Sequence, residues 1–160
     1  MIRRFAAMVC RKARERAFFV ATGLRQHRRV PYYAQRTVTD CGAACLRSVL
    51  PAHGTRVDVW ELDQAFGSGR DGAHAATILR VARGYGLTSS FACRLEPTEL
   101  AGVPMPAILH WDFHHFVVLE RYSVLKGALI VDPSRGRRWV NHADLDARFT
   151  GVALFFVPGP

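Results

Sequence analysis

Residues 35–46 read QRTVTDCGAACL and contain the clearest helix start in the chain. Thr39 and Asp40 are candidate N-cap residues, and the apolar residues that follow at helical spacing predict a helix over Cys41–Leu50. Cys41 would then lie in the first turn, where free backbone N–H groups and the helix dipole favour a thiolate. A lone cysteine at a helix start is more often structural than catalytic, so further residues must decide its role.

The rest of the chain predicts helices first and strands afterwards. Two more helices are expected, over 57–66 and from Asp71 to Gly84. After Gly86 the pattern changes to short apolar runs separated by Pro, Gly and charged turns; the strands expected are 87–95, 107–111, 116–122, 128–131 and 152–157. This order predicts an α+β domain in which an N-terminal helical lobe packs on an antiparallel β-sheet.

The basic charge is concentrated at the N-terminus. The chain has 160 residues, 49% of them hydrophobic, and a net charge of +9, which fits one globular domain. Residues 1–30 hold nine of the 22 Arg and Lys and a single acid, whereas residues 31–160 are nearly neutral. We therefore expect a basic, amphipathic extension over 1–30 and a domain over 31–160. The extension has three candidate uses: contact with a membrane surface, docking on a partner, or a solvated arm. No specific nucleic-acid partner is expected.

The cysteines and histidines give no metal signature. Four cysteines form neither a C-x-x-C pair nor a set at zinc-ligand spacing, so we expect no metal and no cofactor. Reduced thiols and the lack of a secretion signal or membrane span predict a cytoplasmic protein. His53, His74, His110 and His142 stand singly and are expected to be structural or exposed.

A cysteine nucleophile needs a base and a residue that orients the base. His115 precedes the apolar run 116–119, and Asp132 closes the run 129–131. Neighbouring strands that end at one rim would bring this pair within hydrogen-bond distance, with Asp132 fixing the imidazole tautomer. The amide of Gln35, together with the backbone N–H of Cys41, would supply the two donors of an oxyanion hole.

Six segments in order resemble the bacteriocin-processing peptidase family, over about Val30 to Pro158. They are Gln35–Leu46, Arg70–Ala73, Pro106–Trp111, His115–Leu119, Asp132–Pro133 with Gly136, and Phe149–Leu154. The resemblance implies a papain-like thiol peptidase with Cys41 as nucleophile, His115 as base, Asp132 as orienting residue and Gln35 as oxyanion donor. It also implies the substrate: a precursor peptide cut after a Gly-Gly pair, with glycine selected because a tight cleft excludes side chains.

The chain departs from the family in three respects. Members are usually the N-terminal domain of an ABC exporter, yet this sequence ends at Pro160, so we expect a stand-alone enzyme at the inner face of the cell membrane and a separate exporter. The basic extension is longer than the usual lead-in. His114 lies beside His115, and because strand neighbours point to opposite faces, His115 is the expected base and His114 a solvent-facing residue.

Three rival functions stay open. The domain can be a catalytically silent module that binds a leader or secretion substrate for an exporter. The basic extension can make the chain a nucleic-acid or membrane-surface protein. The same triad can also transfer the acyl group to an amine instead of water.

Overall fold

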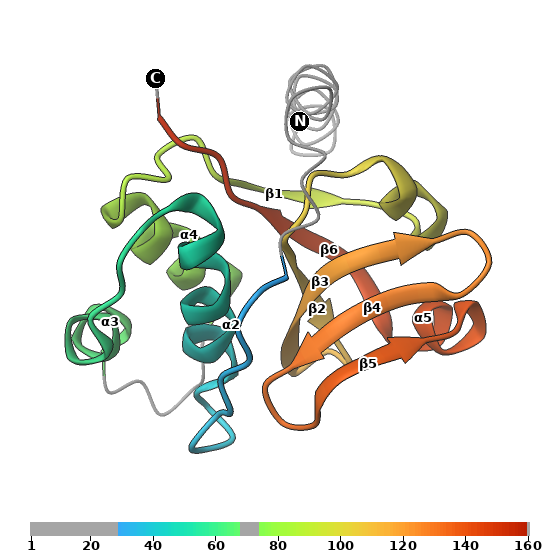
Figure 1. The fold of residues 1–160 in the computed structure, drawn as a ribbon, viewed down its shortest axis with the longest axis horizontal. Helices are drawn as coiled ribbons and strands as arrows, with labels where there is room; N and C mark the ends of the chain where they lie inside the picture. Colours follow the sequence, from blue (N-terminus) through green and yellow to red (C-terminus); the bar gives the residue numbers. More distant parts are fainter. Residues whose placement is uncertain (1–28, 68–73, 160) are drawn as a thin grey trace.

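The computed structural model describes residues 29–67 and 74–159. Three helices form a lobe on one side, and six strands form a single antiparallel sheet in the order β1-β6-β2-β3-β4-β5 (Figure 1). The helices are α2 (Cys41–Val49), α3 (Val59–Phe66) and α4 (Ala75–Gly84), with a 3-10 turn, η1 (Leu50–His53), after α2. The predicted α+β architecture is confirmed.

The strands are short and joined mainly by tight turns. They are β1 (Phe91–Arg94), β2 (Ala107–Trp111), β3 (His115–Ser123), β4 (Gly127–Asp132), β5 (Gly136–Val140) and β6 (Phe149–Phe155). A second 3-10 helix, η2 (Pro97–Gly102), follows β1, and α5 (His142–Arg148) connects β5 to β6. β1 is shorter than predicted because Leu87–Ser90 forms a turn that closes α4.

Two elements escaped the sequence prediction. β5 carries Arg137 and Arg138 where a strand pattern would place apolar residues, and α5 buries only Leu145. Asn141 caps α5 by accepting a hydrogen bond from the N–H of Asp144. Both elements are held by ion pairs, caps and sheet pairing more than by an apolar stripe, and so hydrophobic periodicity did not reveal them.

The sheet separates two hydrophobic cores. One core joins the helical lobe to the sheet, and its members include Leu46, Val49, Ile78, Phe116 and Val118. The other core lies beneath α5 and η2; its members include Leu100, Leu109, Trp111, Val117, Leu119 and Leu145. α2 packs chiefly on β3, so the tertiary core fixes the helix that carries Cys41 against the strand that carries His115.

The segment from Arg29 to Asp40 runs along the junction of the two lobes before it enters α2 (Figure 1). At its start, Val30 N–H donates to Glu120 Oε2 at 2.9 Å, and Arg137 donates to the Val30 carbonyl. Arg137 also pairs with Glu120 at 3.0 Å, and Glu120 is only 5% exposed. A buried ion pair thus holds the backbone N–H and carbonyl of Val30, the residue at which the chain enters the domain.

Some predictions fall beyond the described residues or need correction. Residues 1–28 of the predicted amphipathic extension lie outside the described ranges, and so does the segment Arg70–Ala73. Cys41 and Cys45 carry free thiols, whereas Cys93 is disulfide-bonded, so the prediction of four reduced cysteines is wrong at that position. None of the helices within 29–67 and 74–159 is long and apolar enough to cross a bilayer.

Candidate active site

Cys41 is the first residue of α2 and is 3% exposed. Asp40 occupies the N-cap position, but its carboxylate makes no capping hydrogen bond and lies 3.5 Å from Arg36 Nε instead. Thr39 bonds Thr37 and not the helix. The predicted side-chain cap is therefore wrong, and the positive end of the helix is left to act on Cys41 without a neutralising cap.

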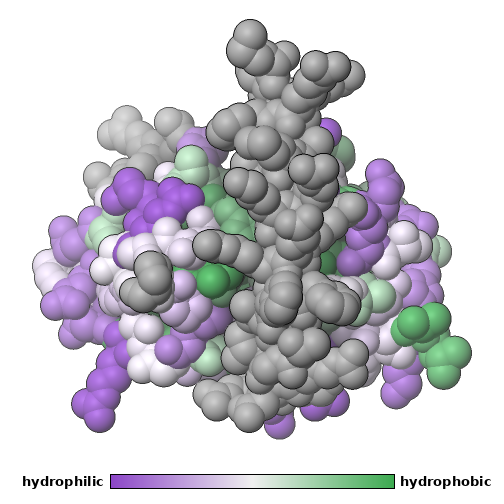
Figure 2. All heavy atoms as spheres, turned by 90° about the horizontal axis from the view of Figure 1, so that it is seen from above, coloured by the Kyte–Doolittle hydropathy of each residue, from purple (hydrophilic) through white to green (hydrophobic). Residues whose placement is uncertain are grey.

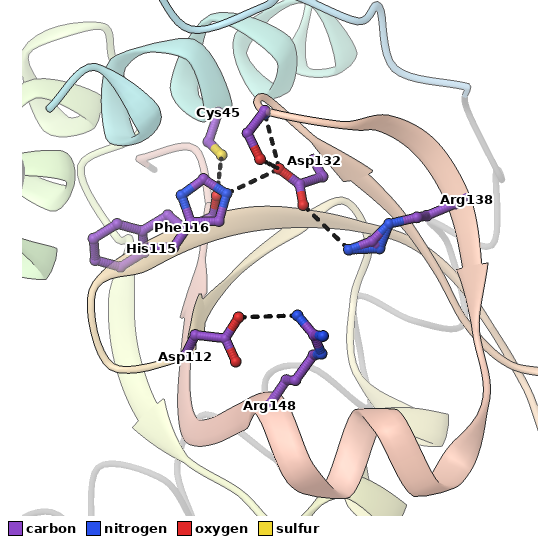
Figure 3. A network of polar contacts seen from close by, with 8 residues as sticks. Cys45, Asp112, His115, Phe116, Asp132, Arg138 and Arg148 are labelled. Atoms are coloured by element: carbon purple, nitrogen blue, oxygen red, sulfur yellow. Dashed lines mark hydrogen bonds and ion pairs between the residues drawn. The ribbon is translucent and has the colours of Figure 1, made fainter. Parts of the chain in front are cut away.

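His115 and Asp132 lie at the same end of the sheet. β3 begins at His115 and β4 ends at Asp132, and because the two strands are antiparallel neighbours these ends meet. His115 Nε2 is 2.9 Å from Asp132 Oδ1 (Figure 3). This contact leaves Nδ1 as the ring nitrogen for a second partner, and Cys41 acts on the ring as well, because it helps to raise the pKa of His115. The structure thus brings together the three residues that the sequence singled out.

Asp132 is held by more donors than sequence reasoning anticipated. Oδ1 accepts from Ser134 N–H at 2.8 Å and from Ser134 Oγ at 2.7 Å, in addition to His115. Oδ2 accepts from Arg138 Nη2 at 3.3 Å (Figure 3). The sequence carried a signal for Ser134, because Asp-Pro-Ser favours a turn in which the Asp side chain bonds the N–H two residues on. It carried none for Arg138, which reaches Asp132 only through pairing of β5 with β4.

The charges of His115 and Asp132 stabilise each other. Burial lowers the pKa of His115, but the hydrogen bonds with Asp132 and Cys41 outweigh it and raise the pKa to about 9. Burial likewise raises the pKa of Asp132, and the hydrogen bonds from His115 and Ser134 reverse this and lower it to about 2. At neutral pH the arrangement therefore holds an imidazolium beside a carboxylate.

Gln35 lies beside the same end of β4. Its backbone N–H donates to the Pro133 carbonyl at 2.9 Å, which ties it to the residue after Asp132. Within the described part of the chain, Oε1 of Gln35 is buried without a hydrogen-bond partner. Amide oxygen and nitrogen have nearly the same shape, so a rotation of the amide places a donor at this position. The Gln35 side chain is thus not committed to a structural role through Oε1.

A second cysteine links the helix to the strand. Cys45 Sγ lies 3.3 Å from the carbonyl oxygen of Phe116, the residue that follows His115 (Figure 3). Burial, followed by the nearby charges of Cys41 and Asp132, holds the pKa of the Cys45 thiol well above its ordinary value. Cys45 therefore stays a neutral S–H donor, and this contact was not foreseen from the sequence.

Three other histidines of the described ranges contact partners outside this cluster. His114 is exposed, and its Nδ1 is 2.6 Å from the Asp112 carbonyl. His110 Nδ1 contacts Thr150 Oγ1 at 2.8 Å, and burial lowers its pKa. His142 Nε2 contacts the Val124 carbonyl at 2.7 Å. No group of His, Cys, Asp or Glu within the described ranges is arranged to hold a metal ion.

A pocket of about 120 Å³ adjoins the site on the Gln35 side. It lies between α2, α3 and the entering segment, and its lining includes Tyr33, Arg47, Leu62 and Asp63. Arg36, which also lines the pocket, forms an ion pair with Asp63 at 2.8 Å, and the Arg47 guanidinium stacks on the Tyr33 ring at 3.8 Å. The pocket is small, partly apolar and lined by both signs of charge.

Curated relatives of this chain are secretion and processing proteins. The chain is 39% identical over 137 residues to a probable microcin-H47 secretion/processing ATP-binding protein of Escherichia coli, and equally to the colicin V secretion/processing ATP-binding protein of that organism. It is 28% identical over 130 residues to a lactococcin-G-processing and transport ATP-binding protein of Lactococcus lactis. These matches cover 85%, 85% and 78% of this chain but only 19%, 19% and 18% of the relatives, so the chain spans about a fifth of their length.

Solved structures with the same fold are peptidase domains. A double glycine motif protease from an AMS/PCAT transporter, solved in complex with the leader peptide, superposes with a TM-score of 0.74 at 36% identity, over 82% of this chain and 93% of that one. The peptidase domain of Streptococcus ComA, an ABC transporter, gives a TM-score of 0.70 at 20% identity, over 82% of this chain and all of that domain, and it supports the fold alone. The Peptidase C39 family model matches residues 29–160, the range that holds the Cys41, His115 and Asp132 cluster, and the chain belongs to that family of cysteine peptidases.

Proposed function

We propose that this chain is a cysteine endopeptidase that cuts the leader from a bacteriocin-like or other secreted precursor peptide after a Gly-Gly pair. The observation that carries the proposal is the 2.9 Å contact between His115 Nε2 and Asp132 Oδ1, together with the influence of Cys41, at the start of α2, on the pKa of the same ring. In this assignment Cys41 is the nucleophile, His115 the acid and base, and Asp132 the residue that orients the imidazole.

The first half of the reaction forms an acyl-enzyme. An imidazolium and a helix N-terminus both stabilise a thiolate on Cys41. The sulfur attacks the carbonyl carbon of the second glycine, and a tetrahedral oxyanion results. When the C–N bond breaks, His115 gives its proton to the departing amine, and a thioester remains on Cys41.

The second half releases the leader. A water molecule attacks the thioester while His115 accepts its proton, and collapse of the second oxyanion frees the leader carboxylate and restores Cys41. Both oxyanions are assigned to two donors: the backbone N–H of Cys41 and the Gln35 amide with its nitrogen turned toward the site. The hydrogen bond from Gln35 N–H to Pro133 supports this role by tying Gln35 to the Asp132 end of β4.

The Gly-Gly preference rests on family membership and on the similarity to the double glycine motif protease that was solved in complex with the leader peptide. Glycine is the residue that a narrow cleft selects by excluding a Cβ atom, since larger side chains overlap with the walls. The secretion and processing roles of the curated relatives favour an ATP-driven exporter as the machinery with which this peptidase works. Residues 1–30 are proposed to contact the inner surface of the membrane through their nine basic residues, which would place the reaction on the cytoplasmic side.

Incubation of the purified chain with a synthetic Gly-Gly precursor peptide under reducing conditions tests the proposal. We expect a leader ending in Gly-Gly-COOH, full loss of cleavage in Cys41→Ala, and a covalent adduct on Cys41 with a peptide aldehyde ending in Gly-Gly. A precursor with Ala in place of the second glycine serves as the matched substrate control and should resist cleavage. Product mass also separates hydrolysis from acyl transfer to an added amine.

The silent binding module makes the opposite prediction in the same experiment. It would bind the leader with the same affinity in the wild type and in Cys41→Ala, and no product would form in either case. Deletion of residues 1–28 should leave peptide cleavage intact while reducing binding to anionic vesicles. Loss of cleavage on that deletion would contradict the division into an extension and a catalytic domain.

A further inference from the structure

The turn between β2 and β3 holds a phenylalanine in a backbone conformation that favours glycine. Asp112 and Phe113 have φ angles of 51° and 63°, and His114 N–H bonds the Trp111 carbonyl at 3.3 Å. Two consecutive residues with positive φ define the tight hairpin turn that usually carries Asn-Gly or Asp-Gly. A bulky aromatic residue in this region is an outlier, because its Cβ crowds the backbone.

The rest of the protein holds this turn in place. Asp112 N–H donates to the Arg148 carbonyl at 2.9 Å, and Asp112 Oδ2 pairs with Arg148 Nη1 at 3.1 Å (Figure 3). His114 adds the contact between its ring and the Asp112 carbonyl. The conformation at Phe113 is therefore imposed by contacts of its neighbours and is not a loose end of the hairpin.

Burial of the Phe113 ring does not offset the strain of its backbone conformation, because the residue is 81% exposed. It stands edge-on to the His110 ring at 6.5 Å, and His110 in turn lies 5.1 Å from the Phe116 ring. Phe116 belongs to the core between the sheet and the helical lobe, and its carbonyl bonds Cys45 of α2. The three rings thus form a row that leads from the core beneath α2 to solvent, two residues before His115.

A strained residue that the surroundings enforce, with its side chain kept in water, is the usual mark of a functional contact. We propose that Phe113 contacts the peptide substrate next to the scissile bond, which deepens the proposed peptidase function and rests on it. The flat apolar ring would pack on the extended main chain of the bound peptide, where a pair of glycines leaves the backbone open to close approach. Phe113 acts here as a binding residue and takes no part in proton transfer.

Three variants separate the ring from the backbone of the turn. Phe113→Ala removes the ring and keeps a residue with a Cβ atom at positive φ, whereas Phe113→Gly removes both the ring and the strain. Phe113→Tyr keeps the ring. We expect KM for a synthetic Gly-Gly precursor to rise roughly tenfold in the Ala and Gly variants, with kcat and its pH dependence changed by less than about twofold. The Tyr variant should behave as the wild type.

Thermal unfolding gives the second readout. Phe113→Gly is expected to melt at or above the wild-type temperature, because the left-handed φ no longer carries a penalty. Leu125→Ala is the matched control. Leu125 is 92% exposed in the turn at the far end of β3, and its loss should alter neither KM nor kcat. Exposed hydrophobic side chains of this kind also appear at the margin of the molecule in Figure 2.

Each contrary result has a definite meaning. If KM of Phe113→Ala and Phe113→Gly stays within about twofold of the wild-type value, the proposed contact is wrong. A fall in kcat with a shifted pH profile would also contradict it, because Phe113 would then act through His115. A melting temperature lowered by more than about 5 °C in Phe113→Gly would make Phe113 structural.

Binding keeps this test independent of catalysis. Affinity for the same precursor is measured in Cys41→Ala, with and without Phe113→Ala, by fluorescence anisotropy. If the wild type fails to cleave, the peptidase proposal fails. A roughly tenfold weaker affinity in the double variant would still support the contact, and an unchanged affinity would refute it.

Discussion

Cys45 Sγ lies 3.3 Å from the carbonyl oxygen of Phe116, so a side chain one turn after Cys41 holds the strand residue that follows His115. The distance between the two reacting side chains therefore depends on packing of α2 on β3 and not on loops. Because this hydrogen bond needs the S–H proton, the raised pKa of Cys45 is part of the same arrangement.

This chemistry predicts selective alkylation. Iodoacetamide reacts with thiolates, so at neutral pH we expect one adduct on Cys41 and none on Cys45 in the folded protein. Peptide mapping by mass spectrometry after brief labelling checks the site, and labelling in urea serves as the control in which both cysteines react. Comparable labelling of Cys45 in the folded state would show that its thiol is neither buried nor neutral.

Removal of the Cys45 donor should loosen the contact between the two elements. Cys45→Val keeps the volume and loses the hydrogen bond, which should cost about 1 kcal/mol in the free energy of unfolding. We expect kcat to fall while KM stays constant, since the change affects the approach of His115 to Cys41. Urea unfolding and steady-state kinetics on the same preparation provide both numbers, and a loss of stability without any change in kcat would contradict the inferred positioning role.

The pair of His115 and Asp132 should make stability depend on pH at both ends. The pKa of His115 is raised from 6.5 to about 9, so its contribution is complete below pH 6.5 and is lost as the pH rises through about 9. The pKa of Asp132 is lowered from 3.8 to about 2, so its contribution is complete above pH 3.8 and is lost as the pH falls through about 2. Urea unfolding across this range should show a plateau between pH 3.8 and 6.5 from this pair, and Asp132→Asn should flatten both slopes.

Activity should follow the same substitution. In Asp132→Asn, His115 loses the carboxylate that raises its pKa, so the alkaline limb of the kcat/KM profile should move to lower pH. The loss of orientation should lower kcat by about 10²-fold or more. Arg138→Gln is the companion variant, because it removes a partner of Asp132 Oδ2 and leaves the contact with His115 in place; we expect a much smaller loss. An unchanged profile in Asp132→Asn would remove Asp132 from the proposed mechanism.

Loss of the buried ion pair between Glu120 and Arg137 should lower the free energy of unfolding strongly. Glu120→Ala leaves the Arg137 guanidinium and the Val30 N–H without their carboxylate, and we expect a loss of about 3 kcal/mol or more in unfolding free energy. Arg36→Ala is the contrasting variant, because its ion pairs are exposed and their loss should cost less than about 1 kcal/mol. Similar losses for both variants would argue against a buried anchor at Val30.

Two glycines with similar φ angles offer a paired test of packing. Gly127 has φ of 97°, and an added Cβ would collide with the Val140 carbonyl; Gly86 has φ of 92° with open space around it. Gly86→Ala should therefore cost only the left-handed strain, about 1–2 kcal/mol, whereas Gly127→Ala should cost that and also part the β4–β5 pairing. Thermal melts of the two variants check the difference, and equal losses would show that the contact at Val140 relaxes freely.

Much of the fold and the site could be predicted from local sequence. Apolar spacing located α2 and most of the strands, because buried faces repeat with the period of a helix or a strand. The order of helices and strands gave the α+β class, and polar residues at strand ends pointed to His115 and Asp132. β5 and α5 were missed because their places are set by Arg137, Arg138 and the Asn141 cap, which are polar contacts without a hydrophobic period.

By itself the sequence determined which residues carry reactive groups, and which segments bury apolar surface. Tertiary structure decided how those groups meet: antiparallel pairing placed the start of β3 beside the end of β4, and packing set α2, which carries Cys41, against β3, which carries His115. It also decided the partners that no local pattern specifies, namely Arg138 on Asp132 and Cys45 on Phe116, and it left the ring of Phe113 exposed. The physical reason is the separation along the sequence over which each kind of interaction acts. Propensity and periodicity act between residues a few positions apart, whereas hydrogen bonds and pKa shifts at this site join residues brought together only when the lobes pack.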